Sequence, residues 1–425
     1  MLVRSSRSLR ISESIVVSVG ILFGISSQPL LAESNPAGAS TAEANVVKIG
    51  ALASLTGPSS DDNKEMINGM ELFLDQVKHS VHGKKIQLIV EDDESNPPKG
   101  KIKFKKLAEQ DKVAMVGGIY FSTVVNQIAA LADQYKIPTV VAVAGADNLT
   151  QRNQHAWVIR SGPSASQRAM PMGDYAAKTL GYKKVITLGP DFLYGYELIG
   201  GFQKVFEDSG GKVVQRLWAG LEARDFESIF KEMHKDANAL FVSVQGVSTA
   251  PFLRQYHLSG LKFPLIGSMN TFDEQNLGAA AEDAEGAISV GPYCSTLDLP
   301  ATKKFVAAYQ AKYHQTPGFY SAAGYTNAMW MYSALNSDKA ALTDHDKLMA
   351  AAKAVKLPDS PMGPLKLDDH QSVVCNIYVR KLQKVNGTYV NKVIYTYPNV
   401  SQFWKWSAAD YLKQPPFSRD FPAIK

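Results

Sequence analysis

Cysteine is scarce in this sequence. Only Cys294 and Cys375 occur among 425 residues, and neither the cysteines nor the histidines show the short spacings of a metal site. In an oxidising compartment the two thiols allow one disulfide, and the alternative is two buried free thiols. We therefore expect no resident metal, and the cysteine spacing indicates no catalytic role.

Long apolar runs are also rare. The run at residues 15–25 is shorter than the roughly 20 residues that a membrane-spanning helix needs. Three arginines precede it and small residues ending at Ala32 follow it, which is the order found in secretory signal peptides. We predict that residues 1–32 are a signal peptide cleaved near Ala32, and that residues 33–45 are a flexible tether. The mature protein should then be exported and soluble.

Charge of one sign is not in excess. The formal net charge is +5 for the whole sequence and falls to +3 when the three Arg and one Glu of residues 1–32 are left out. A charge this small and evenly spread argues against nucleic acid and membrane surfaces as partners.

The motifs of common enzymes are missing as well. The sequence has no Gly-x-Ser-x-Gly elbow, no His-Glu-x-x-His pair, no phosphate-binding loop with its lysine and no Gly-x-Gly-x-x-Gly fingerprint. Its eight histidines are scattered along the chain. We therefore expect a protein that is not an enzyme and uses no cofactor.

From Val46 onward, short β-branched runs alternate regularly with amphipathic helical stretches. This alternation predicts an α/β fold in which helices cover both faces of parallel sheets. About 390 residues exceed what one core supports, so we predict two doubly wound parallel-sheet lobes joined by hinge crossings. The expected lobes are residues 46–162 with 296–360 and residues 163–295 with 361–397, and residues 398–425 form an extension without a predicted placement.

The same pattern predicts the individual elements. Asn96–Pro98 should break the chain before a helix near Lys101–Gln110, and residues 302–335 should be helical. A turn at Val385–Gly387 should close a hairpin between the last two strands. The predicted strands are residues 46–52, 86–91, 113–118, 139–144, 184–188, 212–218, 239–244, 264–266, 287–290, 373–381 and 391–397.

Hydroxyl side chains stand where the third predicted strand gives way to a helix. Ser122 and Thr123 follow the run Gly117–Phe121 directly. Their hydroxyls, together with the free backbone N–H groups of the first helical turn, can bind a carboxylate with help from the helix dipole. The alternative is that one of them only caps the helix, and the two roles are compatible.

The other strand ends carry further candidates, because ligands of open α/β sheets bind at the carboxyl ends of the strands. The small residues Ala144 and Gly145 would let the backbone approach a ligand, or would simply form a tight turn. An aromatic ring at such a place serves packing or recognition. In the second lobe the candidates are Tyr194, Gln245, Met269 and Asn270.

The order of these pieces resembles the branched-chain amino acid (leucine, isoleucine and valine) binding proteins, which have the type I periplasmic binding fold. The resemblance covers nearly all of residues 46–397, and no single piece is diagnostic. The matching pieces include VVKIGALASLTGP, FSTVVNQIAALADQYKIPTV, FLYGYELIGGFQKVFEDSGGKVV and SAAGYTNAMWMYSAL.

The resemblance implies hinged closure around a ligand that both lobes recognise. By position, Ser122 would hold the ligand carboxylate, Ala144 and Gly145 would contribute backbone groups, and Tyr194 would be the aromatic residue of the second lobe. Amino-acid binders often place a second aromatic where this chain has Gln245. They place an acidic partner for the ligand ammonium where it has Met269.

These two departures bear on the ligand. An ammonium left unpaired in a closed cleft costs several kcal/mol, and Met269 cannot pair with it. We therefore predict a carboxylate or amide ligand without an α-ammonium, either aromatic or short aliphatic. Asp273 or Glu274 could still reach the cleft and restore amino-acid binding.

The resemblance also implies a partner and a compartment. The protein would be a monomeric, periplasmic solute-binding protein that delivers its ligand to the permease of an ABC importer in the inner membrane. The main alternative is an extracytoplasmic sensor subunit that presents a small molecule to a membrane receptor. A hydrolase is a third alternative, which the missing nucleophile motif disfavours.

Overall fold

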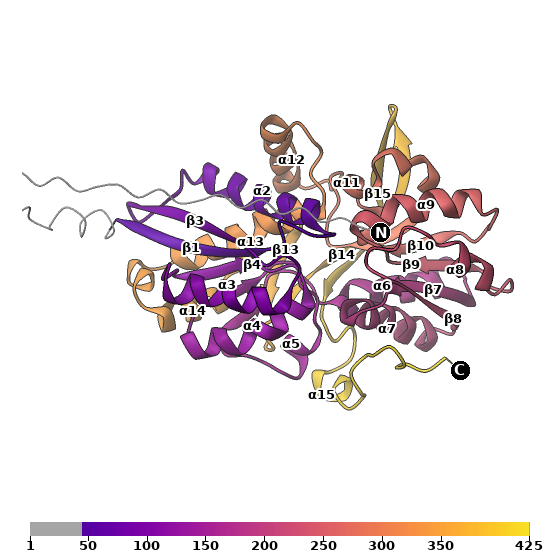
Figure 1. The fold of residues 1–425 in the computed structure, drawn as a ribbon, viewed down its shortest axis with the longest axis horizontal. Coiled ribbons are helices and arrows are strands. Elements are labelled where there is room, and N and C mark those ends of the chain that lie inside the picture. Colours follow the sequence, from indigo (N-terminus) through magenta and orange to yellow (C-terminus); the bar gives the residue numbers. More distant parts are fainter. Residues whose placement is uncertain (1–44, 425) are drawn as a thin grey trace, which may run out of the picture. The chain divides into compact units, whose positions relative to one another are not determined.

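The computed structural model describes residues 45–424, apart from the side chain of Ala279. The predicted signal peptide and nearly all of the predicted tether lie outside the described residues. Within them, helices alternate with strands that form two separate sheets (Figure 1). No described helix is both long and apolar enough to cross a bilayer.

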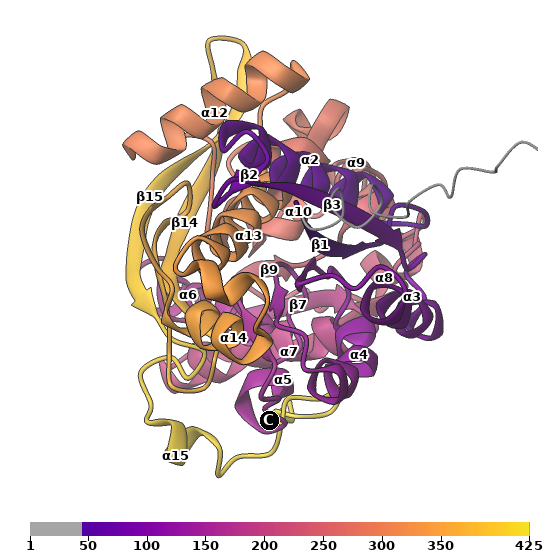
Figure 2. The same ribbon diagram turned by 90° about the vertical axis from the view of Figure 1, so that its left-hand side faces the viewer.

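The first sheet is doubly wound. Its order is β2-β3-β1-β4-β5-β6, and neighbouring strands run parallel except for the short β2. Helices α2 (Ser60–Gln76) and α13 (Phe319–Leu335) cover one face, while α3 (Pro97–Glu109) and α4 (Ser122–Tyr135) cover the other (Figure 2). The strands are β1 (Val46–Ala53), β2 (Ser80–Val81), β3 (Lys84–Asp92), β4 (Met115–Gly118), β5 (Thr139–Val141) and β6 (Val158–Arg160).

The second sheet has a parallel part and an antiparallel part. Its order is β12-β13-β14-β11-β10-β9-β7-β8, with β15 paired to β14. Strands β7 to β11 are parallel, and β12 to β15 are antiparallel to their neighbours. The strands are β7 (Lys184–Pro190), β8 (Lys212–Ala219), β9 (Ala239–Val242), β10 (Leu265–Ser268), β11 (Ile288–Gly291), β12 (Lys356–Ser360), β13 (Gly363–Leu367), β14 (Val373–Val385) and β15 (Thr388–Val400).

Ten further α-helices lie in the described part of the chain. Helices α6 and α7 pack against each other beside the second sheet, and α14 packs against α13 beside the first. The bounds are α5 (Asn148–Gln151), α6 (Ala165–Lys178), α7 (Leu193–Asp208), α8 (Glu227–Glu232), α9 (Thr249–Leu258), α10 (Met269–Phe272), α11 (Glu274–Leu277), α12 (Pro300–Tyr313), α14 (His345–Ala354) and α15 (Ala408–Tyr411). Single 3₁₀ turns are Gly246–Ser248, Gly278–Ala280, Glu282–Ala284 and Lys339–Leu342.

Both parallel sheets have the same strand order. In β3-β1-β4-β5-β6 and in β8-β7-β9-β10-β11, the first strand lies between the second and the third along the chain. The crevice of such a sheet lies outside the carboxyl ends of the first and third strands, where the helices switch faces. The loops after β1, β4, β7 and β9 are therefore the places where a ligand would bind.

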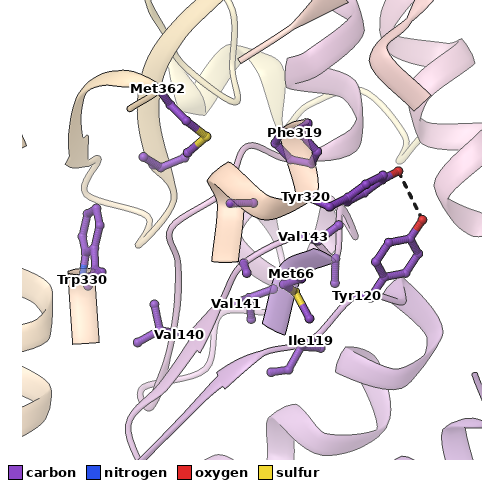
Figure 3. Packing of buried hydrophobic residues seen from close by; sticks show 14 of the residues in the cluster. Met66, Ile119, Tyr120, Val140, Val141, Val143, Phe319, Tyr320, Trp330 and Met362 are labelled. Carbon is purple, nitrogen blue, oxygen red and sulfur yellow. Dashed lines mark hydrogen bonds between the residues drawn. The ribbon is translucent and has the colours of Figure 1, made fainter. Parts of the chain in front are cut away.

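The core around these loops is apolar. Met66 of α2, Val140 and Val141 of β5 and Trp330 of α13 are almost fully buried (Figure 3). The indole Nε1 of Trp330 donates a hydrogen bond to the Ala352 carbonyl at 2.9 Å. This packing fixes the layer from which the loop after β4 emerges.

The predicted fold class is confirmed, and two local predictions were wrong. Asn96–Pro98 begins α3 instead of breaking the chain: the Asn96 side chain accepts a hydrogen bond from Lys99 N at 3.1 Å. Proline has no backbone N–H, but an N–H in the first helical turn would have no partner within the helix. Proline at this place therefore costs the helix no hydrogen bond. The helix predicted over residues 302–335 is two helices, α12 and α13, separated by a segment that contains Pro317 and Gly318.

Candidate functional site

Loops from both sheets meet around one small cavity, whose roughly 240 Å³ of empty space includes open solvent. The loop after β4 supplies three neighbouring residues, and the loops after β7, β9 and β10 supply four more. The loops after β4, β7 and β9 are among the strand ends that the shared topology singles out, and the loop after β10 adds Asn270. The lining residues are Tyr120, Phe121, Ser122, Val143, Arg168, Phe192, Tyr194, Gln245 and Asn270.

Half of the residues predicted from the sequence line this cavity. They are Ser122, Tyr194, Gln245 and Asn270. The other four, Thr123, Ala144, Gly145 and Met269, are outside the lining.

Gly145 and Met269 have definite packing roles nearby. A Cβ added to Gly145 would lie 2.8 Å from Cδ2 of Tyr194, so this glycine lets the tyrosine ring lie against the backbone. The Met269 side chain packs against Gly291 of β11. A Cβ added to Gly291 would lie 2.9 Å from the Cβ of Met269. The Ala144 carbonyl accepts a hydrogen bond from Arg160 Nη1 at 2.8 Å.

Ser122 is the first residue of α4 and does not cap the helix. The N-cap is Phe121, whose side chain makes no capping hydrogen bond. Ser122 is 2 % exposed, and its hydroxyl oxygen has no hydrogen-bond partner among the described residues. The first N–H groups of a helix also lack intrahelical partners and carry partial positive charge. The Ser122 hydroxyl and the N-terminus of α4 thus face the cavity. Val124 N–H donates to the Phe121 carbonyl at 3.1 Å, which leaves the N–H groups of Ser122 and Thr123 for a ligand.

Arg168 adds a full positive charge to the same cavity. It lies in the first turn of α6 and is 1 % exposed. Its Nε donates to the Pro163 carbonyl at 2.9 Å, and its Nη2 donates to the Val143 carbonyl. No described carboxylate lies within ion-pairing distance of its guanidinium. A buried cation without a counter-ion is costly, and an anion in the cavity would compensate it.

Arg168 was not among the residues predicted from the sequence, although a signal was present. Ser164 and Gln167 form a reciprocal capping box that fixes the start of α6. A cation in the first turn of a helix opposes the helix dipole, so an arginine at this point is unexpected for stability alone. The guanidinium carbon also lies 5.7 Å from the ring centre of Tyr194, which is a cation–π distance.

Amide and phenol groups form the polar part of the cavity. The Tyr194 hydroxyl donates to Oδ1 of Asn270 at 2.6 Å. Nδ2 of Asn270 donates to Oε1 of Gln245 at 3.3 Å and to the Tyr320 hydroxyl at 3.0 Å. The Tyr120 hydroxyl lies 3.2 Å from that of Tyr320, a contact drawn in Figure 3. This network joins residues of both sheets through groups that both donate and accept.

Two buried carboxyl groups lie beside the cavity but do not line it. Burial raises the pKa of Asp62 to about 7, and Oδ2 of Asp62 accepts a hydrogen bond from the Tyr120 hydroxyl at 2.7 Å. Burial also raises the pKa of Asp273 to about 7. Its Oδ2 accepts from Phe319 N at 2.8 Å, and Glu274 Oε1 accepts from Asn391 N at 3.0 Å. Asp273 and Glu274 are thus engaged elsewhere and do not supply the missing partner for an ammonium.

The sequence model of the periplasmic binding proteins matches residues 46–387. The chain belongs to this family. A Leu/Ile/Val-binding protein homolog 6 of Brucella melitensis is 27% identical, over 84% of this chain and 93% of the relative.

Solved structures agree with this assignment. An ABC transporter substrate-binding protein from Sphaerobacter thermophilus has a TM-score of 0.80 and 28% identity, covering 84% of this chain and 99% of its own. A solute-binding protein of an ABC transporter from Rhodopseudomonas palustris BisB5, solved in complex with 3,4-dihydroxybenzoic acid, has a TM-score of 0.79 and 30% identity, with coverage of 84% and 99%. This chain is therefore a solute-binding protein of the ABC transporter type and not an enzyme.

The two cysteines of the binding protein are free and buried, so the disulfide that the sequence allowed is not formed. The thiol of Cys294 lies 3.4 Å from the Thr296 hydroxyl, and Cys375 is packed within β14. Burial raises the pKa of Cys294 to about 11 and that of Cys375 to about 12. Both groups stay protonated at neutral pH, and a protonated thiol is a poor nucleophile for disulfide exchange.

Proposed function

We propose that this binding protein captures a small aromatic carboxylate in the periplasm and delivers it to the permease of an ABC importer. The observation that carries the proposal is the buried guanidinium of Arg168, which faces the cavity without a counter-ion. The ligand carboxylate supplies that counter-ion.

The carboxylate has three converging partners. They are the unpartnered hydroxyl of Ser122, the N-terminus of α4 and the guanidinium of Arg168. Hydrogen bonds in which one partner is charged are shorter and stronger than neutral ones. Burial strengthens them further, because charges shielded from bulk water are screened less.

Aromatic side chains form the wall against which the ligand ring would lie. Phe121, Phe192 and Tyr194 line the cavity together with Val143. Phe121 and Phe192 have ring centres 6.5 Å apart, and those of Phe192 and Tyr194 are 6.2 Å apart. Such rings bind another ring in stacked or edge-to-face geometry. The small cavity volume favours a single-ring compound over a larger one.

A hydroxyl substituent on the ring suits the amide end of the cavity. Asn270 and Gln245 can each donate and accept, so they can bind a phenolic hydroxyl. The Rhodopseudomonas relative in complex with 3,4-dihydroxybenzoic acid supports this ligand class. An α-amino acid is less suitable, because no acidic side chain lines the described cavity to pair with its ammonium.

Calorimetric titration tests the proposal. We expect the mature protein to bind 4-hydroxybenzoate or 3,4-dihydroxybenzoate with micromolar or tighter affinity, and to bind leucine much more weakly. Arg168→Met should weaken binding by at least about a hundredfold, because a buried charge pair loses roughly 3–5 kcal/mol when one partner is removed. The matched control is Arg254→Gln, whose side chain is 61% exposed on α9. Tight binding of leucine or valine with no heat from aromatic acids would refute the proposal.

Export, assembly and lobe boundaries belong to the same proposal. We propose cleavage of the leader near Ala32, a monomeric mature protein, and closure of lobe 46–162 with 296–360 onto lobe 163–295 with 361–397. N-terminal sequencing of the periplasmic protein and its mass in solution test the first two points. Stimulation of the permease's ATP hydrolysis by the loaded protein distinguishes an importer subunit from a sensor subunit.

A further inference from the structure

The chain continues beyond the residues that match the family model, which end at position 387. After β15, residues 401–424 run over the surface as a segment that we call the strap (Figures 1 and 2). Its first part contacts α5 and its neighbours. Oε1 of Gln402 accepts a hydrogen bond from the Thr150 hydroxyl at 2.8 Å, and the Gln414 carbonyl accepts one from Arg152 at 2.7 Å.

The middle of the strap is anchored by aromatic residues on α6 and α7. Phe403, Tyr411 and Phe417 form a small buried cluster with Met170 and Val205. Phe417 lies directly on the backbone of α7: a Cβ added to Gly200 would come within 2.6 Å of its ring. The strap is thus packed on the second lobe by apolar burial, which does not depend on its exposed charges.

The end of the strap holds the loop after β7. Nε and Nη2 of Arg419 donate to the two carboxylate oxygens of Asp191, each at 3.1 Å. Such a bidentate pair restrains orientation as well as distance. Two backbone carbonyls fix the strap just beyond it: that of Pro422 accepts from Arg216 at 2.7 Å, and that of Ala423 accepts from Gln203 at 3.1 Å.

Asp191 directly precedes Phe192 and stands three residues before Tyr194, and both of these line the cavity. The Asp191 side chain also accepts a hydrogen bond from the Tyr196 hydroxyl at 2.6 Å. We propose that the strap holds this segment, the loop residues 191–192 and the first turn of α7 at residues 193–196, in its cavity-facing conformation. Arg419 is then a positioning residue that acts through Asp191. The effect of Arg419 on ligand affinity rests on the proposed function, whereas its effect on the conformation of residues 191–196 does not.

Hydrogen exchange of the ligand-free protein tests the loop directly. The Asp191 N–H donates to the Ala219 carbonyl at 2.9 Å, so its exchange reports opening of the loop. In Arg419→Ala we expect amides of residues 191–196 to exchange up to about fivefold faster, the upper range for an exposed ion pair. Arg419→Lys keeps the charge but not the bidentate hydrogen bonding to Asp191. The amides of residues 191–196 should therefore exchange at an intermediate rate in this variant. Lys413→Ala is the control, because Lys413 pairs only with Asp410 inside the strap.

Affinity for 4-hydroxybenzoate provides the second readout. We expect Arg419→Ala to weaken binding by up to about fivefold while the thermal midpoint changes little, since the pair is exposed. Exchange and affinity equal to those of the wild type would overturn the inference. If the wild type binds no aromatic acid, the proposed function fails, and the exchange comparison still decides whether Arg419 positions the loop.

Discussion

At the scale of single residues, the site depends on the Ser122 hydroxyl, which has no hydrogen-bond partner among the described residues, and on the buried guanidinium of Arg168. Ser122 was predictable, because a hydroxyl at a strand-to-helix junction has a local reason to face a ligand. Arg168 was harder to recognise, because its place near a helix start is a weak signal and an arginine in an amphipathic helix is ordinarily solvated. Its burial and the lack of a counter-ion depend on Pro163, Val143 and the second-lobe aromatics, which only the fold brings together.

Asp62 supplies a prediction at this scale. Burial raises its pKa from the ordinary aspartate value of 3.8 to about 7, so the folded protein holds the proton more tightly than the unfolded chain. Stability from this group is present below pH 4 and is lost as pH rises to about 7, by up to about 4 kcal/mol. Asp62→Asn should therefore reduce the fall in unfolding free energy between pH 5 and pH 8, measured by urea denaturation. Asp61→Asn, whose side chain is 93% exposed, is the control; an unchanged pH dependence in Asp62→Asn would contradict the assignment.

At the scale of elements, strands were easier to predict than helix ends. Eleven strands were predicted near their observed positions, because buried parallel strands form apolar runs that are visible locally. The short β2, β6, β12 and β13 were not predicted, since they are strands mainly through their pairing with neighbours. The error at α3 came from treating two prolines as a break, although Asn96 before them is a capping residue.

The N-cap of α3, Asn96, leads to a prediction about stability. Asn96→Ala should lower the free energy of unfolding by about 1 kcal/mol, because Lys99 N loses its side-chain acceptor. The control is Asn153→Ala, an exposed asparagine for which no side-chain hydrogen bond is formed with the described residues. Equal denaturation midpoints for the two variants would show that the cap contributes nothing measurable.

At the scale of the whole molecule, the cavity is a property of two sheets and not of either one. Its lining comes from the loops of both, so ligand binding should favour the arrangement in which they meet. We expect the radius of gyration in X-ray scattering to fall when 4-hydroxybenzoate saturates the protein. Arg168→Met at the same ligand concentration should show no change. Superimposable curves for free and fully loaded wild type would contradict hinged closure.

The sequence by itself determined the class of the protein. The alternation of strands and helices, the candidates at the strand ends and the missing enzyme motifs all follow from residues close together in the chain. The tertiary structure alone decided which candidates share a cavity, that Arg168 faces it without a counter-ion, and that residues 401–424 reach the loop before Tyr194. Periodicity and capping act over a few residues, whereas charge compensation and packing depend on groups that are distant in sequence and meet only after folding.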